Sequence, residues 1–444
     1  MKIFFVSLGC DKNLVDSEKM LSLLYQEGFE LTDDESQAEV IVVNTCCFIH
    51  DAKEESIETI IEMGRQKTEG VCKALIAAGC LAQRYHDEIK EDLPEVDGII
   101  GTTAFDQIAK VIHNVIQGQK EESLQQLEYL PKGLVKRVNT TGGYTSYLKI
   151  AEGCDKHCSY CIIPSLRGHF RSVPMEELLE EAALLAEKGV VELNLVAQET
   201  TLYGKDLYGK KTLPELLRKL CKINGIQWIR LLYCYPEEIT EELIQVIRDE
   251  NKICHYIDMP IQHCNNEILR KMGRRTNKQE LIGIISKLRQ EIPDITIRTT
   301  LISGFPTETE EMHRELVEFV SNMKFERLGV FPYSEEEGTP AASFEGQLPE
   351  KVREQRRDEI MEAQQRLAFT HSEAWIGHSV NVLVEGMIPE EGIYVGRTYM
   401  DAPNVDGCIF FEAPFEMMSG TFAKVQVTDA KGYDLVGCLT QEVE

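Results

Sequence analysis

Two things are scarce in this 444-residue sequence: long apolar runs and basic residues. No apolar run approaches the roughly 20 residues that a membrane-spanning helix needs, which excludes an integral membrane protein. The first apolar stretch, residues 3–6, is too short for the hydrophobic region of a signal peptide and is typical of a buried first strand. We therefore expect a cytoplasmic protein that has no membrane partner.

Lysine and arginine together number only 47, against 74 aspartate and glutamate residues, and the net charge is −27. Because nucleic-acid binding depends on neutralising phosphates, this balance does not favour direct contact with nucleic acid. It favours a basic partner instead. The hydrophobic fraction of 43% and the charged fraction of 27% are ordinary for a globular protein, and they argue against disorder, a collagen-like repeat or a coiled coil.

Cysteine, by contrast, is plentiful, with 14 residues. A disulfide framework is not expected in a reducing compartment, so each cysteine is either a small buried side chain or a ligand of a metal or redox centre. At roughly 150 residues per domain, the length predicts about three domains. The apolar patterns divide the chain into 1–118, 140–369 and 370–440, with a polar linker between the first two.

Residues 1–118 alternate short apolar strands with helical stretches, which predicts an α/β fold with a doubly wound parallel sheet. Cys10, Cys46 and Cys80, the N-terminal triplet, each lie just beyond the C-terminal end of a strand. In such a sheet these ends share one edge, where ligands bind, so the three cysteines can converge. The expected strands are 3–6, 40–43, 74–78 and 99–100, and the expected helices are 15–27, 51–65 and 81–91.

Residues 140–369 resume this alternation with six expected strands, too few for a closed eight-stranded barrel. A partial (β/α)6 barrel fits better, and a long charged helix at about 349–369 follows it. Residues 370–440 lose their helices, and five short strands separated by turns predict a small all-β barrel. The six strands are expected at 144–150, 190–196, 228–233, 256–261, 295–302 and 327–333, and the five at 380–385, 393–399, 408–412, 422–428 and 434–439.

The strongest local pattern is Cys154, Cys158 and Cys161, the loop triplet, directly after the first strand of the second segment. Three thiolates this close together on one loop can bind a single metal centre. A structural zinc site would need a fourth ligand such as His157 or His169. An iron–sulfur cluster of the four-iron, four-sulfur (4Fe–4S) type would instead leave one iron open to a substrate or cofactor. The spacing alone favours neither.

The Cys-x-x-x-Cys-x-x-Cys run, with the aromatic Tyr160 before the last cysteine at the first strand of a partial barrel, resembles the radical S-adenosylmethionine (SAM) superfamily. Together with the N-terminal triplet and the terminal β-barrel, it makes nearly the whole chain similar to the radical SAM methylthiotransferases, whose last domain is called TRAM. This resemblance favours iron–sulfur chemistry over zinc.

The resemblance implies an enzyme with two 4Fe–4S clusters. The loop triplet would hold the cluster whose open iron is chelated by SAM, and one-electron reduction would cleave SAM to a hydrogen-abstracting deoxyadenosyl radical. A donor such as flavodoxin or ferredoxin would deliver the electron. The N-terminal triplet would hold an auxiliary cluster that carries or supplies the sulfur, and a second SAM would provide the methyl group.

One further cysteine could compete for the auxiliary cluster. Cys47 is adjacent to Cys46, and neighbouring side chains of an extended backbone point in opposite directions, so only one of them should face the cluster. The motif Asn44-Thr45-Cys46 favours Cys46. The remaining cysteines are expected to be buried without chemistry; they are Cys72, Cys221, Cys234, Cys254, Cys264, Cys408 and Cys438.

Candidate contacts for SAM lie near the loop triplet and at the ends of barrel strands, where barrel enzymes keep their sites. Tyr160 lies within the cysteine motif, and Gln198 with Glu199 ends the second strand. Gly304 follows the fifth strand and could let the backbone approach the adenosyl group. Ordinary loop chemistry is the alternative for each of the strand ends.

Other polar residues of the second segment stay outside the assigned site, and no catalytic residue is assigned. Gln262 and His263 close the fourth strand, where a core or capping histidine is as common as an active-site one. Arg167 and Arg171 could bind a carboxylate of SAM or of the substrate, although a surface position is the default expectation.

Two methylthiotransferase subfamilies compete for the chain: one modifies tRNA adenosines, the other the β-carbon of an aspartate in ribosomal protein S12. Stretches that resemble the second subfamily are residues 9–18, 48–57, 162–168, 333–339 and 401–407. The resemblance therefore implies methylthiolation of this aspartate, with S12 as the protein partner. A tRNA adenosine methylthiotransferase is the alternative.

The charge of the last segment supports the same choice. From residue 370 onward, three basic residues stand against twelve acidic ones, a net charge of −9. A TRAM barrel that grips tRNA should be basic, whereas an acidic one suits a basic ribosomal protein. Glu390 and Glu391 are typical of solvated surface, and Asp401 and Asp406 are the better candidates for contact with a partner.

Overall fold

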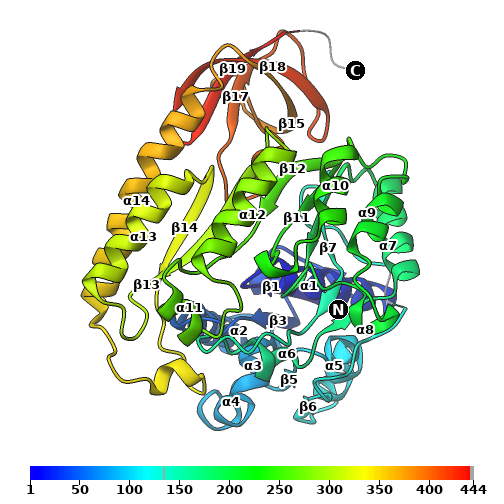
Figure 1. Cartoon of the computed structure of the whole chain (residues 1–444). Helices are drawn as coiled ribbons and strands as arrows, with labels where there is room; N and C mark the ends of the chain where they lie inside the picture. The colour runs from blue at the N-terminus through cyan, green and yellow to red at the C-terminus, as the bar shows by residue number, and fades with distance from the viewer. Residues whose placement is uncertain (134–135, 441–444) are drawn as a thin grey trace.

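The computed structural model describes residues 1–133 and 136–440 and contains two parallel sheets and a closed β-barrel (Figure 1). The first sheet has six parallel strands in the order β2-β1-β3-β4-β5-β6 and includes all four strands expected from the sequence. The strands are β1 Lys2–Ser7, β2 Glu30–Leu31, β3 Val40–Thr45, β4 Ala74–Gly79, β5 Gly98–Ile100 and β6 Glu121–Ser123.

Both faces of this sheet are buried, because its central strands are apolar at consecutive positions. On β3, Ile41 and Val43 pack with α2, α3 and α4, whereas Val40 and Val42 pack with α1 and α5. The doubly wound arrangement is therefore confirmed. The helices are α1 Asp11–Gln26, α2 His50–Glu69, α3 Cys80–Arg84, α4 His86–Asp92 and α5 Ile108–Ile116.

The two edge strands of this sheet were not expected. β2 has two residues and β6 has three, and neither carries the apolar run that marks a buried strand. β6 also lies in the stretch expected to be a linker. Both strands are held by backbone pairing to a longer neighbour, which short polar segments can provide without an apolar pattern.

The second sheet is the expected six-stranded partial barrel, with parallel strands in the order β14-β13-β12-β11-β10-β7. Its strands are β7 Thr145–Lys149, β10 Glu192–Val196, β11 Trp228–Leu231, β12 Ile253–Asp258, β13 Thr296–Ser303 and β14 Arg327–Pro332. β12 begins and ends three residues before the expected strand. Pro260 lies in the expected range but cannot donate a ladder hydrogen bond, so the strand ends before it.

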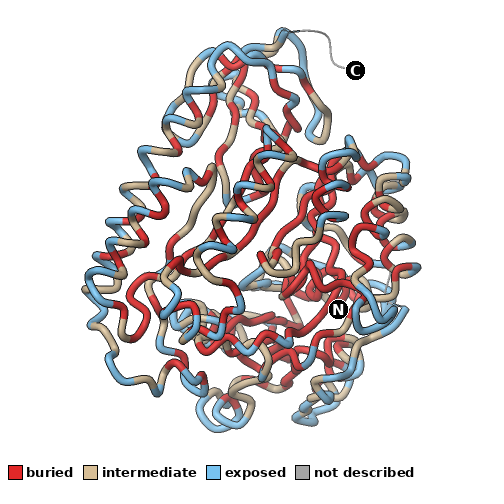
Figure 2. Tube along the Cα trace, viewed as in Figure 1, coloured by how far each residue is buried: buried red, intermediate tan, exposed pale blue. Residues whose placement is uncertain are grey.

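Helices cover the outer face of this sheet, and a short antiparallel pair, β8 Ala151–Glu152 with β9 Arg171–Ser172, follows β7. Figure 2 shows buried residues along the strands and exposed residues along the outward side of helices such as α14. The helices are α6 Ile163–Arg167, α7 Met175–Glu187, α8 Lys205–Tyr208, α9 Leu213–Leu220, α10 Glu241–Asp249, α11 Asn266–Lys271, α12 Lys278–Glu291, α13 Glu310–Met323 and α14 Glu350–Glu373. None of the described helices is both long and apolar enough to cross a membrane.

The last segment forms the expected five-stranded closed barrel, in the order β15-β16-β17-β19-β18, beyond the end of α14 (Figure 1). Its centre is filled by apolar side chains that alternate along the strands, such as Val382 and Val384 on β15. The strands are β15 Ser379–Ile388, β16 Ile393–Arg397, β17 Ile409–Glu412, β18 Phe422–Lys431 and β19 Asp434–Leu439.

The two barrels are joined by buried ion pairs. Glu192, on β10, accepts hydrogen bonds from Arg230 of β11 at 3.1 Å and from Arg397 of the C-terminal barrel at 2.6 Å. Leu193 and Leu195 lie on the opposite face of β10 from Glu192 and belong to the apolar core beneath the helices. The charged residues of β10 and β11 therefore point into the partial barrel, where the C-terminal barrel completes their pairing.

The same interface contains the two carboxylates expected to face a partner, and that expectation is wrong. The side chain of Asp401 is 3% exposed and is paired with Arg327. The side chain of Asp406 is also 3% exposed, accepts from the hydroxyl of Tyr256 at 2.7 Å and lies 3.6 Å from Arg298. Both carboxylates neutralise arginines on the inward face of β13 and β14, so they hold the two barrels together.

Candidate active site

The N-terminal triplet lies at the C-terminal edge of the first sheet. Cys10 precedes α1 directly, Cys46 follows β3, and Cys80 is the first residue of α3 after β4. Burial raises the pKa of the Cys46 thiol to about 12, and the neighbouring thiols of Cys80 and Cys10 oppose a second negative charge beside it. The sheet therefore brings together three cysteines that are separated in the sequence, as the strand pattern predicts.

Cys46 and Cys47 point to different surroundings. A Cβ added to Gly9 would lie 2.7 Å from the Cβ of Cys46 and 3.0 Å from its Sγ, so the Cys46 side chain lies against the turn that carries Cys10. Gly9 adopts a φ of +89°, which favours glycine. Cys47 is fully buried beneath α2 in an apolar cluster that also includes Cys80, away from the turn of Cys10. This arrangement supports Cys46 as the member of the triplet.

The loop triplet follows the β8 segment at the mouth of the partial barrel. Cys154 and Cys158 are buried and Cys161 is half-buried. Burial raises the pKa of Cys161 to about 12, and the thiols of Cys158 and Cys154 lie close enough to raise it further. The loop is fixed by backbone contacts: Ser159 donates its N–H to the carbonyl of Met272 at 2.9 Å.

The two histidines considered as zinc ligands do not join the loop triplet. His157 is exposed, and the side chain of His169 is 71% exposed and bonds to Asp155 at 2.8 Å. In the described part of the chain, no three His, Cys, Asp or Glu side chains are arranged to hold one metal ion. Neither of the two histidines therefore supplies a fourth zinc ligand at the loop triplet.

Gln198 and Glu199 follow β10 and carry buried oxygens that accept no hydrogen bond from the described residues. Gln198 donates its Nε2 to Glu152 at 2.8 Å, and its Oε1 is buried and unpaired. Glu199 Oε2 is likewise without a hydrogen bond and lies 3.4 Å from the Lys156 ammonium. Burial outweighs Lys156 and raises the pKa of Glu199 to about 7. Unpaired polar atoms of this kind fit a polar ligand at the barrel mouth.

Tyr160 and Gly304, the other two expected SAM contacts, pack against other parts of the chain. The Tyr160 ring packs against the apolar cluster that contains Phe305 and Tyr333, on the side of the loop triplet. Gly304 has a φ of +68°, and a Cβ there would lie 2.6 to 2.9 Å from atoms of Arg353 on α14. The glycine is therefore required by the approach of α14, a reason that differs from the expected approach of an adenosyl group.

His263 is a capping residue, one of the two roles that the sequence left open. Its Nδ1 accepts the backbone N–H of Asn265 at 2.9 Å, and its fully buried ring lies 3.6 Å from Glu308. Gln262 adopts a φ of +70°, and its Oε1 is buried without a hydrogen bond among the described residues. Its amide therefore adds a second unpaired group near the end of β12.

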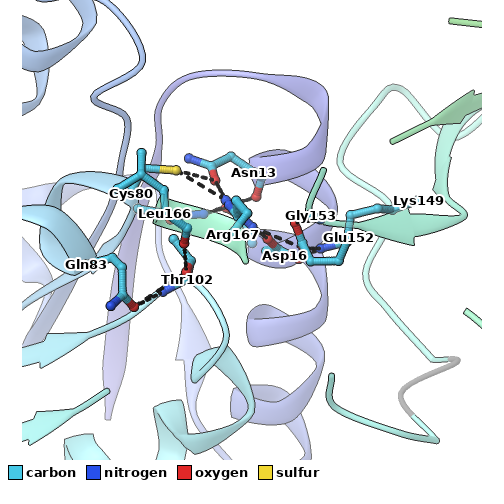
Figure 3. A network of polar contacts seen from close by, with 12 residues as sticks. Asn13, Asp16, Cys80, Gln83, Thr102, Lys149, Glu152, Gly153, Leu166 and Arg167 are labelled. Atoms are coloured by element: carbon cyan, nitrogen blue, oxygen red, sulfur yellow. Dashed lines mark hydrogen bonds and ion pairs between the residues drawn. The ribbon is translucent and has the colours of Figure 1, made fainter. Parts of the chain in front are cut away.

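Arg167 is not on the surface, contrary to the default expectation. It is 2% exposed and lies at the centre of a network between the first sheet and the partial barrel (Figure 3). Its Nη1 donates to Asp16 at 2.9 Å and to Glu152 at 3.2 Å, and its Nη2 reaches Asn13 and lies 3.4 Å from Cys80 Sγ. Because Glu152 also binds Gln198, one guanidinium connects the N-terminal triplet with the barrel mouth.

Lys149 completes the network by binding Asp16 and, at 2.7 Å, Glu152 (Figure 3). Burial alone would raise the pKa of Glu152, but Lys149 and Arg167 outweigh it and hold the carboxyl below its ordinary pKa. Sequence reasoning missed these residues. One signal was available, because Lys149 is a charged residue within the expected strand 144–150 and Glu152 lies two residues past it.

Comparisons with known proteins agree with this architecture. Residues 2–101 match the uncharacterised protein family UPF0004, residues 148–320 match the radical SAM superfamily, and residues 376–439 match the TRAM domain. Among solved structures, the radical SAM methyltransferase TsrM of Kitasatospora setae, with cobalamin and a 4Fe–4S cluster bound, has a TM-score of 0.55 at 14% identity, covering 77% of this chain and 76% of that one. That likeness concerns the fold.

Two relatives match almost end to end. The chain is 62% identical over 437 residues to the ribosomal protein uS12 methylthiotransferase RimO of Lachnoclostridium phytofermentans, covering 98% of this chain and 99% of the relative. It is 49% identical over 438 residues to the RimO of Pelotomaculum thermopropionicum, with the same coverage of both chains. The family expected from the sequence is confirmed: the chain belongs to the RimO family of radical SAM methylthiotransferases.

Proposed function

We propose that this chain methylthiolates the β-carbon of an aspartate in ribosomal protein uS12, with sulfur from the auxiliary cluster region and methyl from a second SAM. The relatives that match the whole chain are named for uS12. One observation carries the proposal: Arg167 contacts both Cys80, at the edge of the first sheet, and Glu152, at the barrel mouth. Sulfur supply and radical chemistry then meet at one junction.

Two 4Fe–4S clusters and SAM are the cofactors of this proposal. Each triplet offers three soft thiol ligands, and a four-iron cluster held by three cysteines keeps one iron open. When bound, these groups supply hydrogen abstraction, sulfur and the methyl group. Cys154, Cys158 and Cys161 would hold the cluster that binds SAM, and Cys10, Cys46 and Cys80 the auxiliary one.

The other residues of the barrel mouth would bind and orient SAM and shield the cluster of the loop triplet from water. One oxygen each of Gln198 and Glu199 accepts no hydrogen bond from the described residues and is available to the polar groups of SAM. Tyr160 and its apolar neighbours would shield the loop triplet from solvent. The backbone around Gly304 lies at the same end of the barrel. Burial of Cys154 and Cys158 would keep water away from the cluster that the loop triplet holds.

The three segments would divide the work. In this proposal residues 1–118 hold the auxiliary cluster, 140–369 bind SAM, and the TRAM barrel at 370–440 contacts uS12. The reaction would take place in the cytoplasm, with an electron donor such as flavodoxin or ferredoxin. Although Asp401 and Asp406 are buried, the TRAM barrel also has exposed carboxylates: Glu390, Glu391, Glu412 and Glu416. These negative charges suit a basic protein better than tRNA.

The mass of uS12 tests this proposal. Deleting the gene should remove the mass of one methylthio group from uS12 and leave the methylthioadenosines of tRNA unchanged. Restoring the wild-type gene should return the mass, and restoring a Cys158→Ala gene should not. A loss of methylthioadenosine with uS12 intact would favour the tRNA alternative instead.

A further inference from the structure

Lys12 is a buried cation at the junction of the first sheet and the partial barrel. The residue is 7% exposed, and its ammonium lies 3.2 Å from the centre of the Tyr233 ring. Within the described residues, no carboxylate lies within ion-pairing distance of this ammonium. The adjacent Asp11 carboxylate lies instead 3.5 Å from the Tyr233 hydroxyl.

Two other buried cations at this junction are neutralised by carboxylates, and a third donates to the backbone. Arg167 is paired with Asp16 and Glu152, and Lys156 is paired with three glutamates of the barrel mouth. Arg274 stacks on a tyrosine ring but also donates to a backbone carbonyl at 2.8 Å. Among the described residues, the Lys12 ammonium has neither a carboxylate nor a carbonyl partner. Because burying a charge without a counter-charge is costly, its position favours an anionic group that arrives from outside the chain.

The position of Lys12 limits which anion this is. Lys12 is two residues beyond Cys10, in the first turn of α1, and the next turn of α1 packs against the interior of the partial barrel through Val15. Tyr233 lies just past the end of β11 with a φ of +60°, a strained conformation for a residue with a side chain. The ammonium therefore lies between the N-terminal triplet and the mouth of the barrel.

We propose that Lys12 binds the side-chain carboxylate of the target aspartate and so selects an acidic residue as substrate. This inference rests on the proposed function. The carboxylate is bonded directly to the β-carbon, so an ion pair at Lys12 fixes that carbon between the two cysteine triplets. An adenosine base carries no negative charge and gains nothing from this contact, which makes Lys12 a specificity-determining residue.

The test uses reconstituted holoenzyme under anaerobic conditions and uS12 carrying either the target aspartate or an asparagine in its place. Wild-type enzyme should bind the asparagine form roughly 10- to 100-fold more weakly, the range that a charge-assisted contact supplies. Lys12→Met should weaken binding of the aspartate form by a similar factor and bind both forms alike. Lys12→Arg should restore part of the preference.

Lys53→Met is a matched control, because Lys53 also lies over a tyrosine ring in the first domain, 5.6 Å from the centre of Tyr85. It should keep the wild-type preference. Equal binding of both substrate forms by the wild-type enzyme would overturn the proposal without needing any variant to fold. A Lys12→Met enzyme that keeps its substrate preference but loses SAM affinity, or changes the spectrum of the auxiliary cluster, would assign Lys12 to those anions. Failure of the wild-type enzyme to modify uS12 at all would instead reject the proposed function.

Discussion

The guanidinium of Arg167 lies 3.4 Å from the sulfur of Cys80, although the two residues lie in different helices and are 87 positions apart. Arg167 is reached only after the chain has passed through the loop triplet and the short helix α6. The segment that follows one cysteine triplet therefore supplies a cation to the other, and the two halves of the site are built from shared parts.

Replacing Arg167 with methionine should make the reduction potential of the auxiliary cluster more negative, because a hydrogen bond to a cluster sulfur favours the reduced form. Lys149→Met disturbs the same two carboxylates but has no contact with Cys80, so it should leave that potential unchanged. Both variants break a buried ion pair and should lose roughly 3–5 kcal/mol of stability. Redox titration followed by electron paramagnetic resonance measures the potential, and equal shifts in both variants would contradict a specific role of the Cys80 contact.

Substitutions in the two triplets should have different effects on SAM cleavage and sulfur insertion. Cys158→Ala should remove about four irons per chain and abolish reductive cleavage of SAM, since the open iron that SAM needs is lost. Cys46→Ala should lose a similar amount of iron but keep SAM cleavage and block sulfur insertion. Cys47→Ala should keep both clusters, because its side chain packs in the apolar cluster. Iron analysis and product mass spectra check all three, and loss of the auxiliary cluster in the Cys47 variant would reassign the ligand.

The contact between the barrels should weaken in acid. Burial would raise the pKa of Glu192, but Arg397 and Arg230 outweigh it and lower that pKa to about 2 from an ordinary 4.5. A lowered carboxyl pKa contributes stability that is complete above about 4.5 and is lost as the pH falls towards 2. Glu192→Gln should be destabilised at neutral pH and should show less of this acid-dependent loss.

Thermal unfolding between pH 7 and pH 3, combined with limited proteolysis at the end of α14, measures the effect at Glu192. Glu267→Gln is a suitable control, because Glu267 is an exposed carboxylate paired within its own helix with Lys271. If the two variants have the same pH dependence, the interface does not depend on the charge of Glu192.

Gly304→Ala should destabilise the barrel more than its backbone conformation alone explains. The residue has a φ of +68°, which costs an L-residue about 1–2 kcal/mol, and the new methyl would meet Arg353 at 2.6 Å. Gly209→Ala is matched in φ at +71° but has open space around it. The first variant should therefore lose at least about 1 kcal/mol more than the second in a denaturant titration. Equal losses would remove α14 as the reason for the glycine.

Much of this architecture was predictable because it depends on local patterns. The apolar runs at residues 40–43 and 74–78 identify central strands, and a cysteine just past such a strand must lie at the sheet edge. What could not be predicted depends on pairing over long distances. Glu192 and Arg397 are 205 positions apart, and each by itself resembles an ordinary surface charge in the sequence.

In the candidate site, too, the local patterns were predictable and the long-range pairings were not. The two triplets are visible as a local motif and as a repeated position after strands, but Arg167 has no local pattern that separates it from an exposed arginine. Its burial depends on Asp16, which is 151 positions away. The expectation that Asp401 and Asp406 contact a partner was wrong for the same reason, because net charge does not reveal which carboxylates already have a partner within the chain.

The buried pairing between the barrels sets a condition for exchanging modules among related enzymes. A foreign C-terminal domain grafted after α14 would have to bring an arginine to Glu192 and carboxylates to Arg298 and Arg327. Without them Glu192 would keep only Arg230 and Arg298 only Asp258, and Arg327 would lose the carboxylate it pairs with, which should destabilise the partial barrel. Exchanging the C-terminal barrel within this family therefore means transplanting the inward-facing residues of the strands together with that barrel.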